Sequence, residues 1–150
     1  MESVAAAFIG LLKQKAREYP LSCGVNARVV KNSYDMLKDA EKKGAEFVFG
    51  GPEYLTETSL APVLLTGVTK DMSISDEESF GPSASIFVVK DDSELIIVVN
   101  DSVYGLDAFL HTRDMTRAVN IAVNLEVGRV RVNSAAHEGM WLCPAVVLRN

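Results

Sequence analysis

The order of strand-forming and helix-forming segments in the second half of the chain constrains the fold most. Residues 83 to 89 are rich in side chains that favour β-structure, and two similar short runs follow at residues 107 to 111 and 129 to 133. The intervening segments read as helices. A strand, helix, strand, helix, strand order at this spacing predicts two crossover connections and a parallel sheet, so the expected fold class is α/β.

Capping residues mark the ends of these two helices. Asp91 is followed three residues later by Glu94, an arrangement that can form a capping box at the start of the first helix. Thr112 is placed to cap the second helix, which we expect to run to about Leu125. Gly128 then closes it before the third strand.

The first half of the chain predicts helices and strands separated by glycines. Gly44 is expected to end the second helix in the left-handed conformation. Gly50 begins a polar segment up to Ser59 that reads as a surface loop. The expected helices lie at residues 3 to 18 and 27 to 43, and the expected strands at residues 46 to 49 and 62 to 67.

Size and charge limit the kinds of protein that this chain can be. Its 150 residues suit a single domain with one core. A net charge of -5 and a pI near 5.0 disfavour a nucleic-acid surface, which needs clustered lysine and arginine. The apolar runs are far shorter than the ~20 residues of a membrane helix, and no secretory signal is visible, so we expect no membrane contact and a cytoplasmic location.

Two short motifs carry a resemblance to a known family. They are Glu77-Glu78-Ser79-Phe80-Gly81-Pro82 and Asn100-Asp101-Ser102-Val103-Tyr104-Gly105-Leu106. Together they resemble the aldehyde dehydrogenase superfamily, and the resemblance implies that Glu78 holds the nicotinamide ribose and that Phe80 lines the nicotinamide ring. It also implies a three-layer parallel-sheet domain. The motif residues Tyr104 and Gly105 are expected to be structural, with the glycine permitting a tight turn.

The resemblance covers only the later part of that family's catalytic domain, from about residue 4 to about residue 133. Aldehyde oxidation needs a cysteine nucleophile, a carboxylate base, amide donors for the oxyanion and a bound nicotinamide. The sequence has no Gly-Gln-x-Cys segment and no glycine-rich nucleotide loop. Cys23 and Cys143 are expected to be reduced, unreactive thiols. We therefore expect no nicotinamide cofactor and no metal site.

The segment from about residue 134 departs from the family pattern. It lacks the expected Pro-Phe-Gly-Gly segment and instead places His137 and Glu138 near Trp141. A histidine there can act as an acid or base, although an exposed loop histidine is the alternative. Glu78 likewise reads either as a pocket wall or as part of a solvated acidic pair, and Phe80 either as a pocket residue or as a core aromatic. The candidate catalytic residues are His137, Glu138 and Glu78, and the candidate substrate-binding residues are Phe80, Asn133, Met140 and Trp141.

Three functions remain open from the sequence. The first is a single truncated domain turned into an enzyme that needs no nicotinamide and isomerises or cyclises an apolar small molecule, in a pocket between Glu78 and the loop from Asn133 to Trp141. The second is a non-catalytic pseudoenzyme or partner subunit. The third is a split or residual NAD(P)-dependent aldehyde dehydrogenase. Exposure of surfaces that the family normally covers predicts a homodimer.

Overall fold

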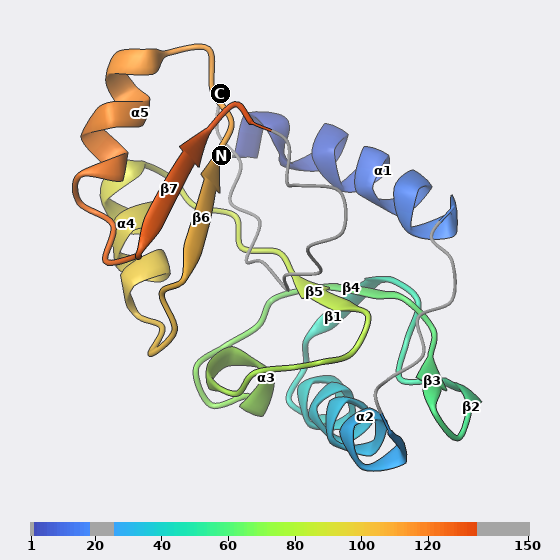
Figure 1. Ribbon diagram of the computed structural model, residues 1–150. Helices are drawn as coiled ribbons and strands as arrows, with labels where there is room; N and C mark the ends of the chain where they lie inside the picture. Colours follow the sequence, from blue (N-terminus) through green and yellow to red (C-terminus); the bar gives the residue numbers. More distant parts are fainter. Residues whose placement is uncertain (1, 19–25, 135–150) are drawn as a thin grey trace. The chain divides into compact units, whose positions relative to one another are not determined.

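The computed structural model describes residues 2–18 and 26–134, which form two compact units (Figure 1). One unit comprises residues 8–87, and the other comprises residues 1–7 and 88–150. The helices are α1 (Glu2–Glu18), α2 (Ala27–Lys42), α3 (Ser73–Asp76), α4 (Asp92–Asn100) and α5 (Met115–Ala122). The strands are β1 (Glu46–Phe49), β2 (Tyr54–Thr56), β3 (Ser59–Leu60), β4 (Val63–Thr66), β5 (Ser83–Ser85), β6 (Asp107–Leu110) and β7 (Arg129–Val132).

Helix α2 has well-formed caps at both ends. The side chain of Asn26 accepts a hydrogen bond from the backbone N–H of Val29 at 3.0 Å. At the other end, Gly44 has a φ of +94°, and its N–H donates to the carbonyl of Glu41 while the N–H of Ala45 donates to that of Ala40. This pair of bonds is the Schellman motif, so the expected role of Gly44 as the helix terminator is confirmed.

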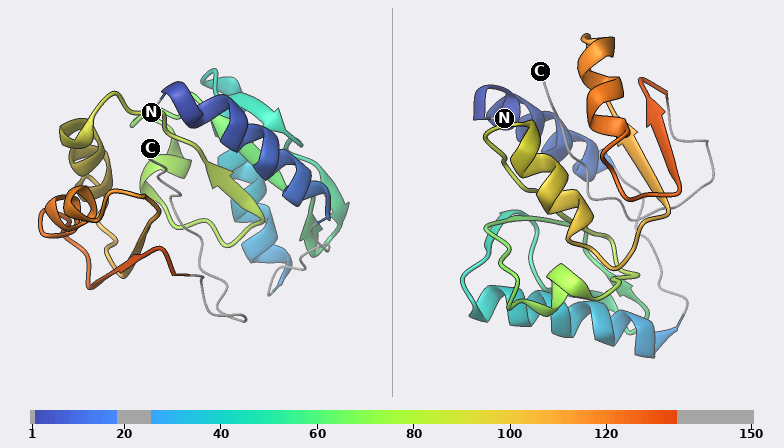
Figure 2. Two further views of the ribbon diagram at one scale, coloured as in Figure 1. Left: turned by 90° about the horizontal axis from the view of Figure 1, so that it is seen from above. Right: turned by 90° about the vertical axis from the view of Figure 1, so that its left-hand side faces the viewer.

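Helix α2 packs on a three-stranded sheet in the order β1-β4-β5. Strand β4 pairs antiparallel with β1 and parallel with β5. In the right-hand view of Figure 2, α2 runs horizontally along the bottom of this unit. The core between helix and sheet is apolar and buried, and its members are Leu37, Ala40, Ala45, Val63, Leu65 and Met72.

The segment from Gly50 to Ser59, expected to be a loop, contains a hairpin. Strands β2 and β3 pair antiparallel across it. The hydroxyls of Thr56 and Ser59 are 2.7 Å apart, and the ring of Tyr54 stacks on that of Tyr34 in α2, with 4.4 Å between ring centroids. The loop prediction was wrong because these two contacts order a polar segment whose composition alone favours irregular structure.

Asp39 connects α2 to α3. Its carboxylate accepts hydrogen bonds from the backbone N–H of Ser73 at 2.9 Å and from the Ser73 hydroxyl at 3.2 Å. Met72, at the N-cap position of α3, offers no side-chain cap, so a carboxylate from another helix caps α3 instead. Lys43 forms an ion pair with Asp39 at 2.9 Å. Helix α3 ends just before the Glu77-Glu78 pair and therefore fixes where that pair begins.

The second unit contains the crossover expected from the sequence. Strands β6 and β7 pair parallel, with Ala108 opposite Val130 and Leu110 opposite Val132, and α5 lies between them in the chain. Its buried core joins this apolar strand face to α4 and α5 and contains Val89, Leu95, Leu110 and Ile121. The α/β fold is thus confirmed. None of the helices in the described ranges is long and apolar enough to cross a membrane.

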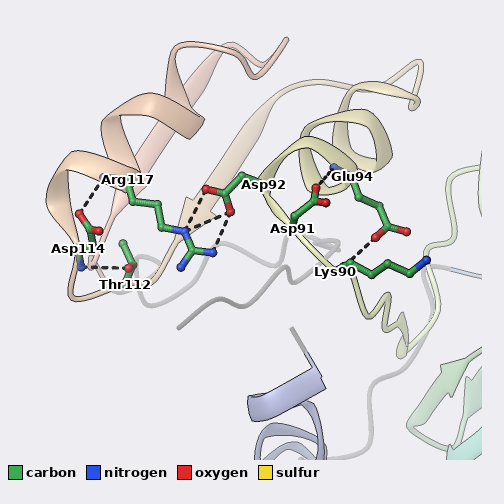
Figure 3. Close-up of polar contacts among 7 residues, drawn as sticks. All are labelled: Lys90, Asp91, Asp92, Glu94, Thr112, Asp114 and Arg117. Carbon is green, nitrogen blue, oxygen red and sulfur yellow. Dashed lines mark hydrogen bonds and ion pairs between the residues drawn. The ribbon is translucent and has the colours of Figure 1, made fainter.

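Figure 3 shows the polar contacts at the starts of α4 and α5. The Asp91 carboxylate accepts from the N–H of Glu94 at 2.9 Å, which confirms Asp91 as the cap. The cap of α5 is Asp114, which accepts from the N–H of Arg117 at 2.9 Å. The expectation of a cap at Thr112 was wrong, because its hydroxyl instead accepts from the N–H of Asp114 and shapes the preceding turn.

The other expected crossover, from residues 83–89 to residues 107–111, does not form within one sheet. Strand β5 covers only Ser83–Ser85 and lies beside β4, whereas β6 belongs to a separate sheet with β7. The Val63 N–H donates to the carbonyl of Pro82 at 2.8 Å, and Val63 is the register partner of Ser83. The turn through Pro82 thus directs β5 alongside β4, a long-range pairing that sequence spacing does not specify.

Replacing Gly50 by Ala is expected to lower the free energy of unfolding by more than about 2 kcal/mol. Gly50 has a φ of +66°, and an added Cβ would lie 2.2 Å from the backbone oxygen of Pro62. Equilibrium urea unfolding measures the change. Gly51→Ala is the matched control, since a Cβ there meets no atom within 4 Å, and it should change stability by less than about 1 kcal/mol. Equal losses in the two variants would contradict this account.

Replacing Asp39 by Asn is expected to weaken the dependence of stability on acid pH. The N–H of Ser73, followed by Lys43, holds the pKa of Asp39 below its ordinary value. A carboxyl with a lowered pKa stabilises the fold above the unfolded-state pKa of about 4, and this contribution is lost as the pH falls through the folded-state pKa. Asp39→Asn should therefore destabilise the protein at neutral pH and flatten its loss of stability below about pH 4.

The matched control for Asp39 is Asp35→Asn. Asp35 forms an exposed ion pair with Lys31 on the same helix, and such pairs contribute little to stability. Urea midpoints measured between about pH 2 and 7 compare the two variants. If the fall in urea midpoint at acid pH were unchanged in Asp39→Asn, Asp39 would not have this role. The same conclusion would follow if Asp35→Asn reduced that fall by an equal amount.

Candidate functional site

The Glu77-to-Pro82 motif follows α3, and in it one buried residue stands between exposed ones. Glu78 is exposed, Ser79 is buried, and Phe80 is 65% exposed. The side chains of Glu78 and Phe80 are therefore accessible on either side of the buried Ser79. The alternative that Phe80 is a core aromatic is wrong. The segment offers an anionic group and an aromatic ring to the surroundings.

Buried hydroxyl groups hold this segment against α2. The Ser79 hydroxyl donates to that of Ser33 at 3.5 Å, lies 3.2 Å from that of Ser83, and accepts from the N–H of Gly81 at 3.4 Å. A Cβ added at Gly81 would lie 2.7 Å from the Cβ of Ser33. The glycine therefore permits close approach to the helix, and the serines fix the direction in which Glu78 and Phe80 point.

The second motif begins with Asn100, whose side-chain amide connects the end of α4 to the segment that follows α5. Nδ2 of Asn100 donates to the carbonyl of Asn124 at 2.8 Å, and its Oδ1 accepts from the N–H of Glu126 at 2.9 Å. A Cβ at Gly105 would lie 2.6 Å from the carbonyl oxygen of Glu126. The expected structural role of Gly105 is therefore correct, and its cause is close backbone approach.

Asn133 has a comparable position at the carboxyl end of β7. It has a φ of +52°, its Oδ1 accepts from the N–H of Thr112 at 3.0 Å, and its Nδ2 donates to the Thr112 carbonyl at 2.8 Å. Its backbone N–H also continues the strand ladder to Leu110. Both ends of the amide are thus engaged with the loop before α5, and substrate binding by Asn133 stays a prediction.

The face of β6 and β7 that points away from their apolar core is polar. Arg129 forms two hydrogen bonds with Asp107, at 2.5 and 2.8 Å, and the Asp107 side chain is only 3% exposed. The bonds from Arg129 hold the pKa of Asp107 below its ordinary value. The guanidinium of Arg131 lies over the ring of Phe109, 5.7 Å from its centroid. This face carries two cations and one carboxylate.

The predicted site residues fall into separate groups. Glu78 and Phe80 belong to the first unit, together with their serine anchor, and Asn133 belongs to the second. The remaining candidates, His137, Glu138, Met140 and Trp141, lie outside the described residues, as do both cysteines. A pocket between the Glu78 segment and the loop from Asn133 to Trp141 stays a prediction. Among the residues described, no cluster of three His, Cys, Asp or Glu side chains could hold a metal ion.

Sequence reasoning missed two features of these surfaces. Ser33 and Ser79 are 46 residues apart, and no periodicity links them, although Ser79 lies inside the motif itself. Arg131 could have been singled out, because it alternates with Val130 and Val132 in a strand whose other face is apolar. Arg131 thus lies near the carboxyl end of a parallel strand, where open α/β sheets usually bind ligands.

Comparison with known proteins agrees with these observations. The model of the family described as "Aldehyde dehydrogenase family" matches residues 2–143. Glutarate-semialdehyde dehydrogenase of Pseudomonas aeruginosa is 37% identical over 111 residues, covering 73% of this chain and 23% of the relative. 3-Sulfolactaldehyde dehydrogenase of Pseudomonas putida is 33% identical over 138 residues, covering 90% and 28%. The chain thus spans about a quarter of the length of these relatives.

Solved structures give the same result. The structure of NADP-dependent glyceraldehyde-3-phosphate dehydrogenase from Bacillus halodurans, complexed with NADP, superimposes with a TM-score of 0.84 at 31% identity, covering 93% of this chain and 31% of that one. Succinate-semialdehyde dehydrogenase from Burkholderia pseudomallei gives a TM-score of 0.81 at 32% identity, covering 87% and 30%. Sequence, motifs and fold therefore agree that the chain belongs to the aldehyde dehydrogenase family.

Proposed function

We propose that this chain supplies part of the catalytic domain of an NAD(P)-dependent aldehyde dehydrogenase, with the remaining parts provided by polypeptide outside these 150 residues. The observation that carries the proposal is the paired outward presentation of Glu78 and Phe80 on a segment anchored by Ser79. A pair presented in this way suits a ligand that approaches from outside the unit. It favours the split or residual dehydrogenase among the three functions left open by the sequence.

The residues of the segment fit a nicotinamide nucleotide. The Glu78 carboxylate can accept hydrogen bonds from the hydroxyls of a ribose, and the Phe80 ring can lie against a nicotinamide. A bound nicotinamide would accept a hydride from the aldehyde. The described residues supply neither a cysteine nucleophile nor a glycine-rich phosphate loop, so nucleotide binding by the 150 residues alone is expected to be negligible.

Relatives suggest the class of aldehyde. Proteins named for glutarate semialdehyde, 3-sulfolactaldehyde and succinate semialdehyde are among those that match. These substrates carry a carboxylate or sulfonate besides the aldehyde. We therefore propose an aliphatic aldehyde with a second, acidic group as the substrate, in place of the apolar molecule expected from Met140 and Trp141.

A chimera tests the proposed function. In it, the segment of the Pseudomonas aeruginosa glutarate-semialdehyde dehydrogenase that aligns with this chain is replaced by the corresponding residues of this chain. The chimera should reduce NAD(P)⁺ in the presence of the semialdehyde. Glu78→Gln should lower kcat/KM for the nucleotide about ten- to a hundredfold, because a hydrogen bond to a charged group contributes about 1.5 to 3 kcal/mol.

The neighbouring Glu77→Gln is the matched control for Glu78→Gln. Glu77 is also exposed and is one residue closer to α3, so the chimera should tolerate this substitution. Equal losses in the two variants would mean that Glu78 has no special position. A well-folded chimera with neither turnover nor nucleotide binding would contradict the proposed function itself.

The function without a nicotinamide is kept as a second proposal. It is supported by the sequence, in which His137 and Glu138 are adjacent and Trp141 follows three residues later, at the place where the chain departs from the family pattern. An acid or base at His137 could then isomerise or cyclise a substrate unaided. The non-catalytic partner subunit and the cytoplasmic location likewise stay proposals.

An exposed apolar row on α5 supports the proposed self-association. Met115, Val119 and Val123 follow one another at four-residue intervals and are 53%, 55% and 75% exposed. The 150-residue chain is expected to form dimers at tens of micromolar, an ordinary range for weak association. Val119→Asp should shift the equilibrium to monomer in sedimentation, whereas Asn120→Asp on the same exposed helix should not. Monomer alone in the unsubstituted chain would contradict the dimer.

A further inference from the structure

The outward face of the β6 and β7 pair contains one arginine with a partner and one without. Arg129 is opposite Asp107 in the strand register and binds both of its carboxylate oxygens. Arg131 is opposite Phe109, and its guanidinium lies over the aromatic ring. Within residues 2–18 and 26–134, Arg131 has no ion-pair partner. Arg131 is therefore attracted by the charge of Asp107 but forms no direct salt bridge with it.

Arg131 also has a side-chain hydrogen-bond donor that is not used. Nε of Arg131 is buried and has no partner among the described residues. The carboxylate on the same face, Asp107, already receives two bonds from Arg129. A buried N–H without an acceptor is unfavourable and requires an explanation, and an anionic acceptor is the natural partner of a guanidinium.

The position of Arg131 in the sheet is suitable for a ligand. It is the second-last residue of β7, and open α/β sheets bind ligands outside the carboxyl ends of their parallel strands. Ser134, just beyond that end, also has a buried hydroxyl without a partner among the described residues. Two unsatisfied donors thus occur within four residues, at the end of the strand where a ligand is expected. Stacking on Phe109 restricts the guanidinium and leaves its planar edge to pair with a carboxylate or sulfonate.

We propose that Arg131 binds the acidic group of the aldehyde substrate and thereby makes the site specific for aldehydes that carry a carboxylate or sulfonate. This inference rests on the proposed function, because it names the residue that recognises the proposed substrate class. Arg131 is a substrate-binding residue in this account and takes no part in the chemical step.

Kinetics of the chimera test the inference through specificity. Arg131→Met should raise KM for glutarate semialdehyde about ten- to a hundredfold, the usual effect of losing a charged hydrogen bond, and should leave KM for the neutral butyraldehyde unchanged. Arg131→Lys should restore part of the loss, because it keeps the charge but not the planar fork. Arg113→Met is the matched control, since Arg113 is an exposed arginine in the loop after β6. Equal changes with both aldehydes, or no change with either, would overturn the inference.

Ligand binding separates this inference from the proposed function. Glutarate should bind the unsubstituted 150-residue chain in ligand-detected NMR and should not bind Arg131→Met, with the urea midpoint of each variant checking that it is folded. Glutarate binding without turnover in the chimera would sink the proposed function and keep the role of Arg131. Turnover by the chimera that does not change in Arg131→Met would keep the proposed function and overturn the role of Arg131.

An internal partner for Arg131 is the competing explanation. Glu138 lies seven residues further along the chain and could supply the anion instead. In that case Glu138→Gln would destabilise the chain as much as Arg131→Met, and the double variant would be no worse than either single one. Such coupling, together with unchanged semialdehyde KM, would assign Arg131 to an internal ion pair and overturn its role in substrate binding.

Discussion

The contact between Gly81 and α2 is the constraint on which the candidate nucleotide surface depends. A side chain at Gly81 would overlap Ser33, so the loop approaches the helix only because that side chain is missing. Close approach lets Ser79 reach the Ser33 and Ser83 hydroxyls. A buried hydroxyl that loses its partners costs about 1 to 3 kcal/mol, so these bonds hold Ser79 inward and its two neighbours outward. The motif thus combines residues that fix the segment with residues that a ligand can contact.

Local signals in the sequence were sufficient for much of the fold. Gly44 and Asp91 act through bonds with backbone groups within a few residues, and both have the expected roles. The α5 cap was misassigned by two residues because Thr112 and Asp114 are both good caps and the choice depends on how the turn closes. The hairpin and the pairing of β5 with β4 depend on distant partners. Those partners cannot be read from composition or period.

The site was predicted less completely than the fold. The motif identified Glu78 and Phe80, and family resemblance gave them roles that their exposure is compatible with. The serine anchor and the unpaired donor of Arg131 were not visible, because they depend on which groups lack or find partners after folding. Asn133 was expected to bind substrate, but its amide already bonds the backbone of Thr112. The sequence thus singled out candidate residues but not the contacts that support them.

The Asn133 contact has a chemical consequence. One end of the amide donates to Thr112 and the other end accepts from it, so an ionised carboxylate, which only accepts, cannot take its place. Hydrolysis of this amide to a carboxylate, a common form of protein ageing, would place a negative oxygen against the Thr112 carbonyl. Attraction between β7 and the loop before α5 would become repulsion at that point. Loss of the Asn133 side-chain amide would therefore weaken the junction between β7 and the loop before α5.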